Sequence, residues 1–77
     1  MVYDSVERRL AQTLLTLSQK FGPTIPLTKH ELAELANTTV ETTIRILSQL
    51  KKRGVLKSSR GSTTIAKLDQ LQALAGS

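Results

Sequence analysis

The chain has 77 residues, which is enough for one small domain with a single core. Eleven Lys and Arg against six Asp and Glu give a net charge of +5, which favours a polyanionic partner such as nucleic acid. A membrane surface is a weaker candidate, because binding there usually needs Trp and Phe side chains, and the chain has no Trp and only one Phe. The absence of cysteine excludes disulfide and thiolate metal sites. No apolar run approaches the roughly 20 residues of a membrane span, and no charged start followed by an apolar stretch marks a secretory signal, so a cytoplasmic location is expected.

The first predicted element is an amphipathic helix over residues 3–20. Its apolar residues recur at helical spacing: Val6, Leu10, Ala11, Leu14, Leu15 and Leu17. Phe21-Gly22-Pro23 ends this helix. Because a residue before proline avoids the helical region, Ile25-Pro26-Leu27 is predicted to be extended, as a short strand or arm.

A shorter helix is predicted over 28–36. Thr28 and Glu31 have the spacing of a capping box, in which a hydroxyl and a carboxylate each accept a hydrogen bond from a free backbone amide. Asn37 follows the helix and tolerates the left-handed backbone that a sharp corner needs. The chain is therefore predicted to turn at this point.

The next helix is predicted over 39–53, with Thr38 or Thr39 as its cap. An apolar stripe faces the core through Ile46, Leu47 and Leu50. The outward face carries Glu41, Arg45, Ser48 and Lys52. Helix, corner and helix together indicate a helix-turn-helix motif.

Gly54 ends this helix, and a hairpin is predicted over 55–65 with its turn at Arg60-Gly61. A final helix over 67–75 is expected to fold back on the core. The predicted fold class is therefore mainly α with a small β-hairpin wing, a winged helix-turn-helix that forms one domain over 1–77.

Residues 25–65 closely resemble the C-terminal winged helix-turn-helix DNA-binding domain of the cyclic-AMP-receptor and FNR (CRP/FNR) family of bacterial transcription regulators. The preceding run VERRLAQTLLTL resembles the helix that leads into that domain. Most specific is the run TVETTIRIL, which is similar to the family's Val-Glu-Thr-x-Ser-Arg variant of the recognition helix. We use the name recognition helix for residues 39–53.

The resemblance implies sequence-specific binding of double-stranded DNA, with the recognition helix in the major groove of an inverted-repeat operator of TGA-like half-sites. It also implies a homodimer in the full-length regulator, contact with RNA polymerase, and a ligand-sensing barrel and dimerising helix ahead of this domain. The chain looks like an isolated C-terminal piece, either monomeric or self-associating through the apolar face of its first helix. No cofactor is expected in this chain, and no effector can be assigned.

Four residues are the predicted base contacts: Val40, Glu41, Ile44 and Arg45. Arg45 can donate two parallel hydrogen bonds to guanine O6 and N7, and Glu41 can accept one from a cytosine amino group. In the family the corresponding Glu and Arg contact bases around a G·C pair, so the resemblance implies the same here. The alternative is an intrahelical pair between these two side chains, worth only about 0.2 to 0.5 kcal/mol.

Ile44 and Val40 leave the operator sequence open. At the position of Ile44 the FNR branch usually has Ser and the cyclic-AMP-receptor branch has Gly. Ile44 either contacts a thymine methyl group or packs at the rim of the core beneath Leu32 or the wing. At the position of Val40 the cyclic-AMP-receptor branch has Arg and the FNR branch has Val, so this chain resembles the FNR branch more closely.

The predicted phosphate contacts are Thr39, Thr42, Ser48, Lys52, Lys57, Ser59, Arg60 and Gly61. Two ordinary explanations compete with this assignment. The run Lys51-Lys52-Arg53 lies at a helix C-terminus, where the dipole stabilises positive charge whatever the partner. Arg60-Gly61 also suits a hairpin tip for reasons of turn chemistry alone.

Catalysis and metal binding have little support in the sequence. The single histidine, His30, falls in the exposed first turn of a predicted helix, and neither a cysteine nor a second histidine is present to complete a metal site. Glu31 is better used as a cap than as an acid–base partner of Glu34. No enzyme activity is expected. The alternative to DNA binding is a winged helix used for protein–protein interaction or oligomerisation, since this fold serves both roles.

Overall fold

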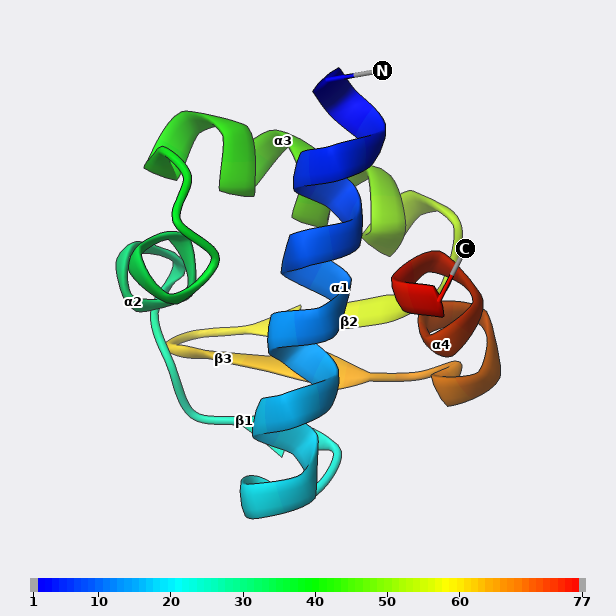
Figure 1. Cartoon of the computed structure of the whole chain (residues 1–77). Helices are drawn as coiled ribbons and strands as arrows, with labels where there is room; N and C mark the ends of the chain where they lie inside the picture. The colour runs from blue at the N-terminus through cyan, green and yellow to red at the C-terminus, as the bar shows by residue number, and fades with distance from the viewer. Residues whose placement is uncertain (1, 77) are drawn as a thin grey trace.

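A long helix, α1 (Val2–Phe21), crosses in front of a small sheet and packs against helices on either side (Figure 1). The computed structural model describes residues 2–76, with side chains from residue 6 onward. Within this range the remaining elements are β1 (Thr24–Ile25), α2 (Lys29–Leu35), α3 (Val40–Lys52), β2 (Leu56–Ser59), β3 (Ser62–Ile65) and α4 (Leu68–Gly76). This mainly helical architecture with a hairpin wing confirms the predicted fold class.

The sheet has three antiparallel strands in the order β1-β3-β2. In the hairpin, Leu56 pairs with Ile65 and Ser59 pairs with Ser62, so that Arg60-Gly61 forms the predicted two-residue turn. The third strand, β1, pairs with β3 and overlaps the predicted extended segment only at Ile25, because the strand starts at Thr24 and ends before Pro26. The wing is therefore anchored to the end of α1 as well as to α3.

The start of α2 has the predicted capping box. The Thr28 hydroxyl accepts a hydrogen bond from the Glu31 amide (3.2 Å), and a Glu31 carboxylate oxygen accepts one from the Thr28 amide (2.9 Å). These contacts give two otherwise unpaired amides an acceptor, which explains why a helix of only 7 residues begins so sharply.

Replacing Thr28 with Ala is expected to lower the free energy of unfolding by about 1 kcal/mol, because the Glu31 amide loses its acceptor. Urea denaturation followed by circular dichroism measures the change. Thr16→Ala, at an exposed position within α1, is the matched control and should have little effect. Equal losses in the two variants would show that the capping box does not stabilise the domain.

The end of α2 is closed by a Schellman motif. Asn37 has a φ of 56°, as predicted for the corner, and its amide donates to the Glu34 carbonyl (3.2 Å). The Thr38 amide donates to the Ala33 carbonyl (2.9 Å). Because Thr38 is part of this motif, Thr39 is the N-cap of α3. Of the two caps predicted for this helix, the structure therefore has the second.

The end of α3 has the same motif. Gly54, at a φ of 78°, donates to the Lys51 carbonyl (3.0 Å), and the Val55 amide donates to the Leu50 carbonyl (2.9 Å). Because the Val55 amide completes this helix, the strand starts at Leu56, one residue later than predicted. Val55 and Leu50 are both fully buried, which supplies the apolar contact that accompanies the motif.

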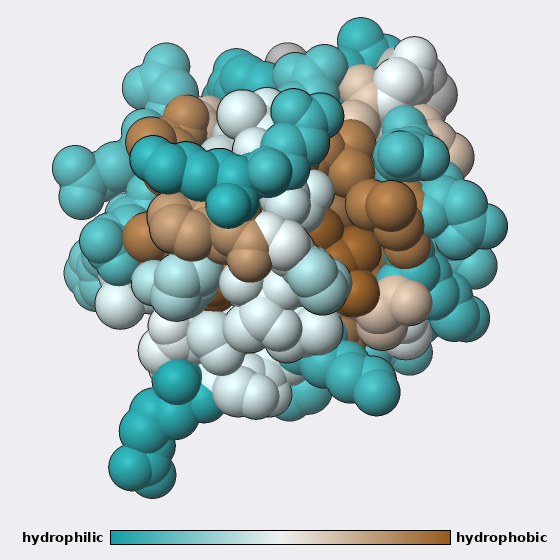
Figure 2. Space-filling model, turned by 90° about the horizontal axis from the view of Figure 1, so that it is seen from below, coloured by the Kyte–Doolittle hydropathy of each residue, from teal (hydrophilic) through white to brown (hydrophobic). Residues whose placement is uncertain are grey.

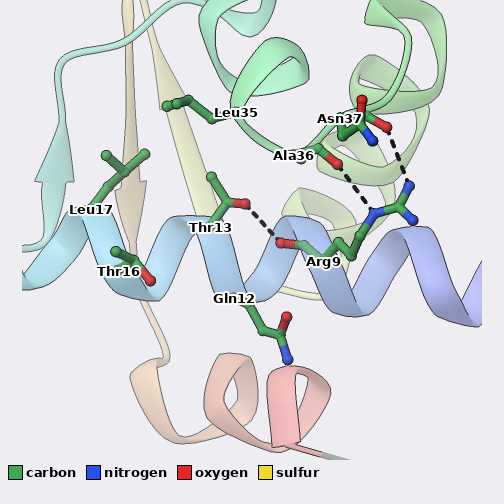
Figure 3. Close-up of a pocket in the computed structure, with 8 residues that line it drawn as sticks. All are labelled: Arg9, Gln12, Thr13, Thr16, Leu17, Leu35, Ala36 and Asn37. Carbon is green, nitrogen blue, oxygen red and sulfur yellow. Dashed lines mark hydrogen bonds between the residues drawn. The ribbon is translucent and has the colours of Figure 1, made fainter.

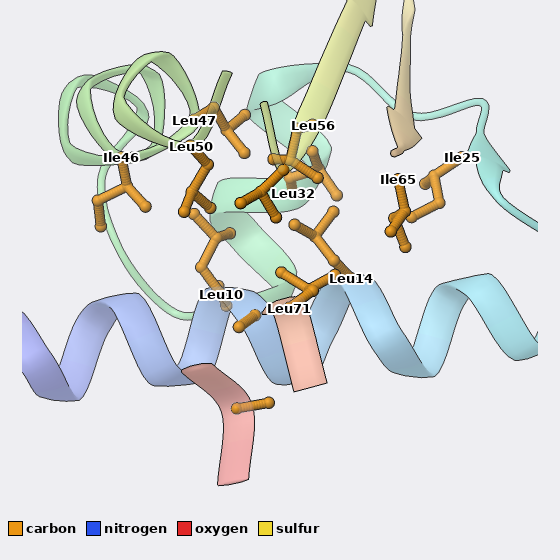
Figure 4. Packing of buried hydrophobic residues seen from close by; sticks show 14 residues of the cluster. Leu10, Leu14, Ile25, Leu32, Ile46, Leu47, Leu50, Leu56, Ile65 and Leu71 are labelled. Carbon is orange, nitrogen blue, oxygen red and sulfur yellow. The ribbon is translucent and has the colours of Figure 1, made fainter. Parts of the chain in front are cut away.

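One hydrophobic core joins these elements. Figure 4 shows Leu10 and Leu14 pointing from α1 toward Leu32 and Leu50, while Leu71 approaches from α4, which folds back as predicted. The buried cluster comprises Leu10, Ala11, Leu14, Ile25, Leu32, Ala36, Ile46, Leu47, Leu50, Val55, Leu56, Ile65, Leu71 and Ala75. Both helices of the helix-turn-helix therefore rest on a shared apolar base.

Candidate nucleic-acid interface

The two sides of α3 differ sharply in burial, as its apolar stripe predicts. The buried residues are Thr43, Ile46, Leu47 and Leu50. The predicted outward residues are all exposed: Glu41, Arg45, Ser48 and Lys52. Since the core fixes one side of the helix, the other projects these polar side chains from a rigid support.

Glu41 and Arg45 lie one turn apart on the exposed flank of α3. Among the side chains that the structure describes, neither takes part in a hydrogen bond or an ion pair, so the intrahelical pair considered above is not formed. Their donors and acceptors therefore remain free for an external partner. Gln49 is exposed one turn beyond Arg45 and extends the same flank, although the outward face as predicted did not include it.

Val40 and Ile44, the two apolar residues among the predicted base contacts, lie at the border of this flank. Ile44 is 43% exposed, whereas Val40 is half-buried in the first turn of α3. Ile44 thus keeps a large part of its side chain open to a partner. An exposed β-branched residue beside Glu41 and Arg45 suits an apolar contact such as a thymine methyl group.

The threonines at the start of α3 are linked to each other. The Thr39 hydroxyl accepts from the Thr42 amide (3.2 Å) and donates to the Thr42 hydroxyl oxygen (2.9 Å). The Thr39 proton is therefore used within the protein, and the Thr42 proton is left to donate outward. Of the two predicted phosphate contacts, Thr42 has the better placed hydroxyl, and Thr39 acts first as a cap.

The wing projects its polar residues near the start of α2. Lys57, Ser59 and Arg60 are exposed, and Gly61 takes a φ of 73° at the tip. A hollow of about 210 Å³ separates the tip from α2, and it is lined by Leu27, Thr28, Lys29, Ser59, Gly61, Ser62 and Thr63. The structure thus brings the exposed Lys29 beside the wing, a neighbour that nothing in the sequence signals.

Positive charge is concentrated around α3 and the wing. Between residues 42 and 68 the chain has no Asp or Glu, and its basic residues there are Arg45, Lys51, Lys52, Arg53, Lys57, Arg60 and Lys67, all exposed. Lys67 was not among the predicted contacts, yet its ammonium group lies beside Gly54, at the end of α3. This surface is suited to a polyanion.

A side chain from α1 holds the corner between the two helices (Figure 3). Arg9 Nε donates to the Ala36 carbonyl oxygen (3.2 Å), and its Nη2 donates to that of Asn37 (3.3 Å). Next to this contact, α1 and α2 enclose an open hollow of about 380 Å³ whose lining includes Leu17 and Leu35. The sequence gives no sign of the contact, because a basic residue on an exposed helix face has many possible roles.

Two kinds of feature were not found in the part of the chain that the structure describes. Among the residues described, no group of three or more His, Cys, Asp and Glu lies together as a metal site would require. None of the helices in this part of the chain has the length and apolar character needed to cross a membrane.

A helix-turn-helix with an exposed polar second helix and a hairpin wing defines the winged helix-turn-helix class of domain. Residues 8–74 match the Crp-like helix-turn-helix domain, and the chain belongs to that family. The predicted resemblance to CRP/FNR regulators is thereby confirmed. The domain belongs to a family of DNA-binding transcription regulators and not to a family of enzymes.

Known relatives agree with this assignment. The Cyclic AMP receptor protein of Thermus thermophilus is 34% identical over 74 residues, which cover 95% of this chain and 34% of that protein. The crystal structure of Thermus thermophilus Catabolite Activator Protein has a TM-score of 0.90 at 32% identity, covering 96% of this chain and 35% of that one. The crystal structure of a putative transcriptional regulator of the crp/fnr family from Eubacterium rectale has a TM-score of 0.88 at 28% identity, and the match covers 92% of this chain and 33% of that one. The chain thus spans about a third of the length of these relatives.

Proposed function

We propose that this domain binds double-stranded DNA in a sequence-specific manner, with α3 inserted in the major groove. The supporting observation is the exposed flank of α3, where Glu41 and Arg45 have no partner among the side chains described. A B-form major groove is wide enough for a helix, and its base edges present donor and acceptor patterns that these side chains complement.

In this proposal Arg45 contacts guanine and Glu41 contacts the cytosine amino group at a G·C pair of a TGA-like half-site. Val40 and Ile44 supply apolar contacts at the neighbouring positions. Phosphate groups are contacted along α3 by Thr39, Thr42, Ser48 and Lys52, and by the wing through Lys57, Ser59, Arg60 and Gly61. The base contacts give specificity, and the phosphate contacts give orientation and most of the salt dependence.

The family membership also supports a two-fold arrangement in the full-length regulator. Two copies of this domain bind half-sites about 34 Å apart, one helical turn of DNA, on an inverted repeat. RNA polymerase is a further partner of the complete regulator. A single domain contacts only one half-site and so binds more weakly than the dimer.

The test is a titration of the protein against a labelled duplex carrying a TGA-type inverted repeat and against a scrambled duplex of equal length, at several salt concentrations. We expect tighter binding to the repeat and a steep fall in affinity as salt rises. Equal affinity for both duplexes at every salt concentration would overturn the proposal.

The Lys52→Ala variant is expected to weaken binding to all duplexes alike and to lower the salt slope by about one, because Lys52 is assigned to a phosphate. Lys20→Ala removes the same charge from the exposed C-terminal end of α1 and is the matched control, with no expected change in slope. A change at Lys52 that depends on the base sequence would contradict the phosphate assignment.

The alternative, a module for protein contact, has one observation in its favour. Figure 2 shows an apolar area on the side of α4, and a hollow of about 340 Å³ in this region is lined by Ser18, Gly22, Pro23, Ile65 and Leu68. Leu68 is 49% exposed. Binding to any acidic polymer irrespective of sequence, unaffected by Arg45→Ala, would favour this alternative.

A further inference from the structure

The contact between Arg9 and the corner joins parts of the chain 27 and 28 residues apart. Ala36 is the C-cap of α2, and Asn37 is the residue with positive φ that follows it. Carbonyl groups at a helix C-terminus carry partial negative charge, so a guanidinium there is held by charge as well as by hydrogen bonds. The planar fork of Arg suits two neighbouring acceptors.

The base from which Arg9 reaches the corner is rigid. Leu10 and Leu14, on the inner side of the same helix, are fully buried in the core. One turn along α1, Gln12 Nε2 donates to the Ala75 carbonyl (3.1 Å), so this helix contacts a C-terminal carbonyl of α4 as well. Arg9 is therefore anchored on a helix that is held in place on both sides of it.

The corner that Arg9 holds leads directly into α3. Only Thr38 separates Asn37 from Thr39, the N-cap of α3, and the Thr38 amide is itself bound to Ala33. Fixing the Asn37 carbonyl therefore fixes the origin of α3. Glu41 and Arg45 lie in the first and second turns after that origin, so their positions depend on it most strongly.

We propose that Arg9 is a positioning residue for DNA recognition, which holds the corner of the helix-turn-helix so that α3 presents its exposed flank at one angle. This inference rests on the proposed DNA binding. Without the tether, α3 samples more orientations, and affinity for the correct site falls with the fraction of molecules in the competent one. Non-specific binding depends on charge and changes little.

Arg9→Ala tests the inference, with Arg8→Ala as the matched control because Arg8 is an exposed neighbour of equal charge on α1. We expect Arg9→Ala to weaken binding to the inverted repeat roughly 5- to 30-fold, with the salt slope and the affinity for scrambled DNA unchanged. The control should stay within about twofold of wild type. Arg9→Lys keeps the charge but loses the fork, so it should give an intermediate loss.

Coupling to α3 separates positioning from a general loss of stability. In an Arg45→Ala background, Arg9→Ala should cause much less further loss than it causes alone, because the base contact that it positions has already gone. Fully additive losses would overturn the inference. A direct phosphate contact by Arg9 would instead lower the salt slope and weaken binding to both duplexes, which would also overturn it.

Hydrogen exchange gives a readout that does not need DNA. The amides of Asn37, Thr38 and Thr42, which donate hydrogen bonds at the corner, should exchange faster in Arg9→Ala than in wild type or Arg8→Ala, while amides of α4 stay protected. Unchanged exchange at the corner would overturn the inference even if DNA binding is confirmed. Failure of the proposed function would appear differently, as an absence of any preference for the repeat in the wild-type protein.

Discussion

Replacing Leu50 with Ala is expected to lower the free energy of unfolding by about 2 to 5 kcal/mol, the largest effect of any single substitution proposed for this domain. Leu50 is 0% exposed and lies in the last turn of α3, where its carbonyl also accepts the Schellman bond from Val55. Truncation removes apolar contacts and leaves a cavity beneath the recognition helix. A domain of this size has a total stability of roughly 4 to 12 kcal/mol, so the loss is a large share of it.

Urea denaturation followed by circular dichroism measures the effect. Leu35→Ala is the matched control, because Leu35 is the same residue type in a neighbouring helix but is 57% exposed. The control should change stability by about 0.5 kcal/mol or less. Similar losses for the two variants would mean that the cluster around Leu50 is not the core that supports α3.

The features that sequence analysis predicted well depend on neighbours within one or two turns of helix. The capping box of Thr28 and Glu31 and the left-handed Asn37 are set by chemistry between residues close in the chain. The predicted ranges 28–36 and 39–53 end at cap residues for the same reason. Burial of one side of α3 also follows from spacing alone.

What the sequence could not predict are contacts between distant segments. Ile25 was predicted to be extended, but the pairing of its neighbour Thr24 with Thr64 in β3, with a hydroxyl contact of 3.1 Å, depends on how α1 lies over the sheet. Arg9 is a similar case, because its two acceptors come from another helix. Lys29 becomes a neighbour of the wing only after folding. Residue spacing carries no information about such tertiary approaches.

The same division applies to the candidate interface. Periodicity placed Glu41, Arg45, Ser48 and Lys52 on one exposed flank, and the structure has them there. Periodicity could not show that the Thr39 hydroxyl donates its hydrogen bond to the Thr42 hydroxyl. The roles assigned to these residues toward DNA stay predictions, and they differ enough from one another to be separated by mutation.

The Arg45→Ala variant is expected to lose about 1 to 3 kcal/mol of binding free energy for the inverted repeat and to relax specificity at one base pair. Two parallel hydrogen bonds from a guanidinium distinguish guanine O6 and N7 from the edges of the other bases, and Ala can make neither. Arg45→Lys should also lose much of the discrimination, because an ammonium group keeps the charge but not the planar fork.

Selection from a random duplex library measures this change directly, since the motif enriched by each variant can be compared position by position. Arg53→Ala is the matched control: it deletes the same charge from the exposed C-cap of the same helix, and it should leave the enriched motif unchanged. If Arg45→Ala keeps the wild-type motif while Lys52→Ala alters it, the two roles are exchanged. Because Arg45 and Lys52 share one flank of α3 but lie about two turns, roughly 10 Å, apart along the helix, such an exchange would also require the helix to enter the groove by its C-terminal half, with the wing displaced from the phosphates that it is proposed to contact.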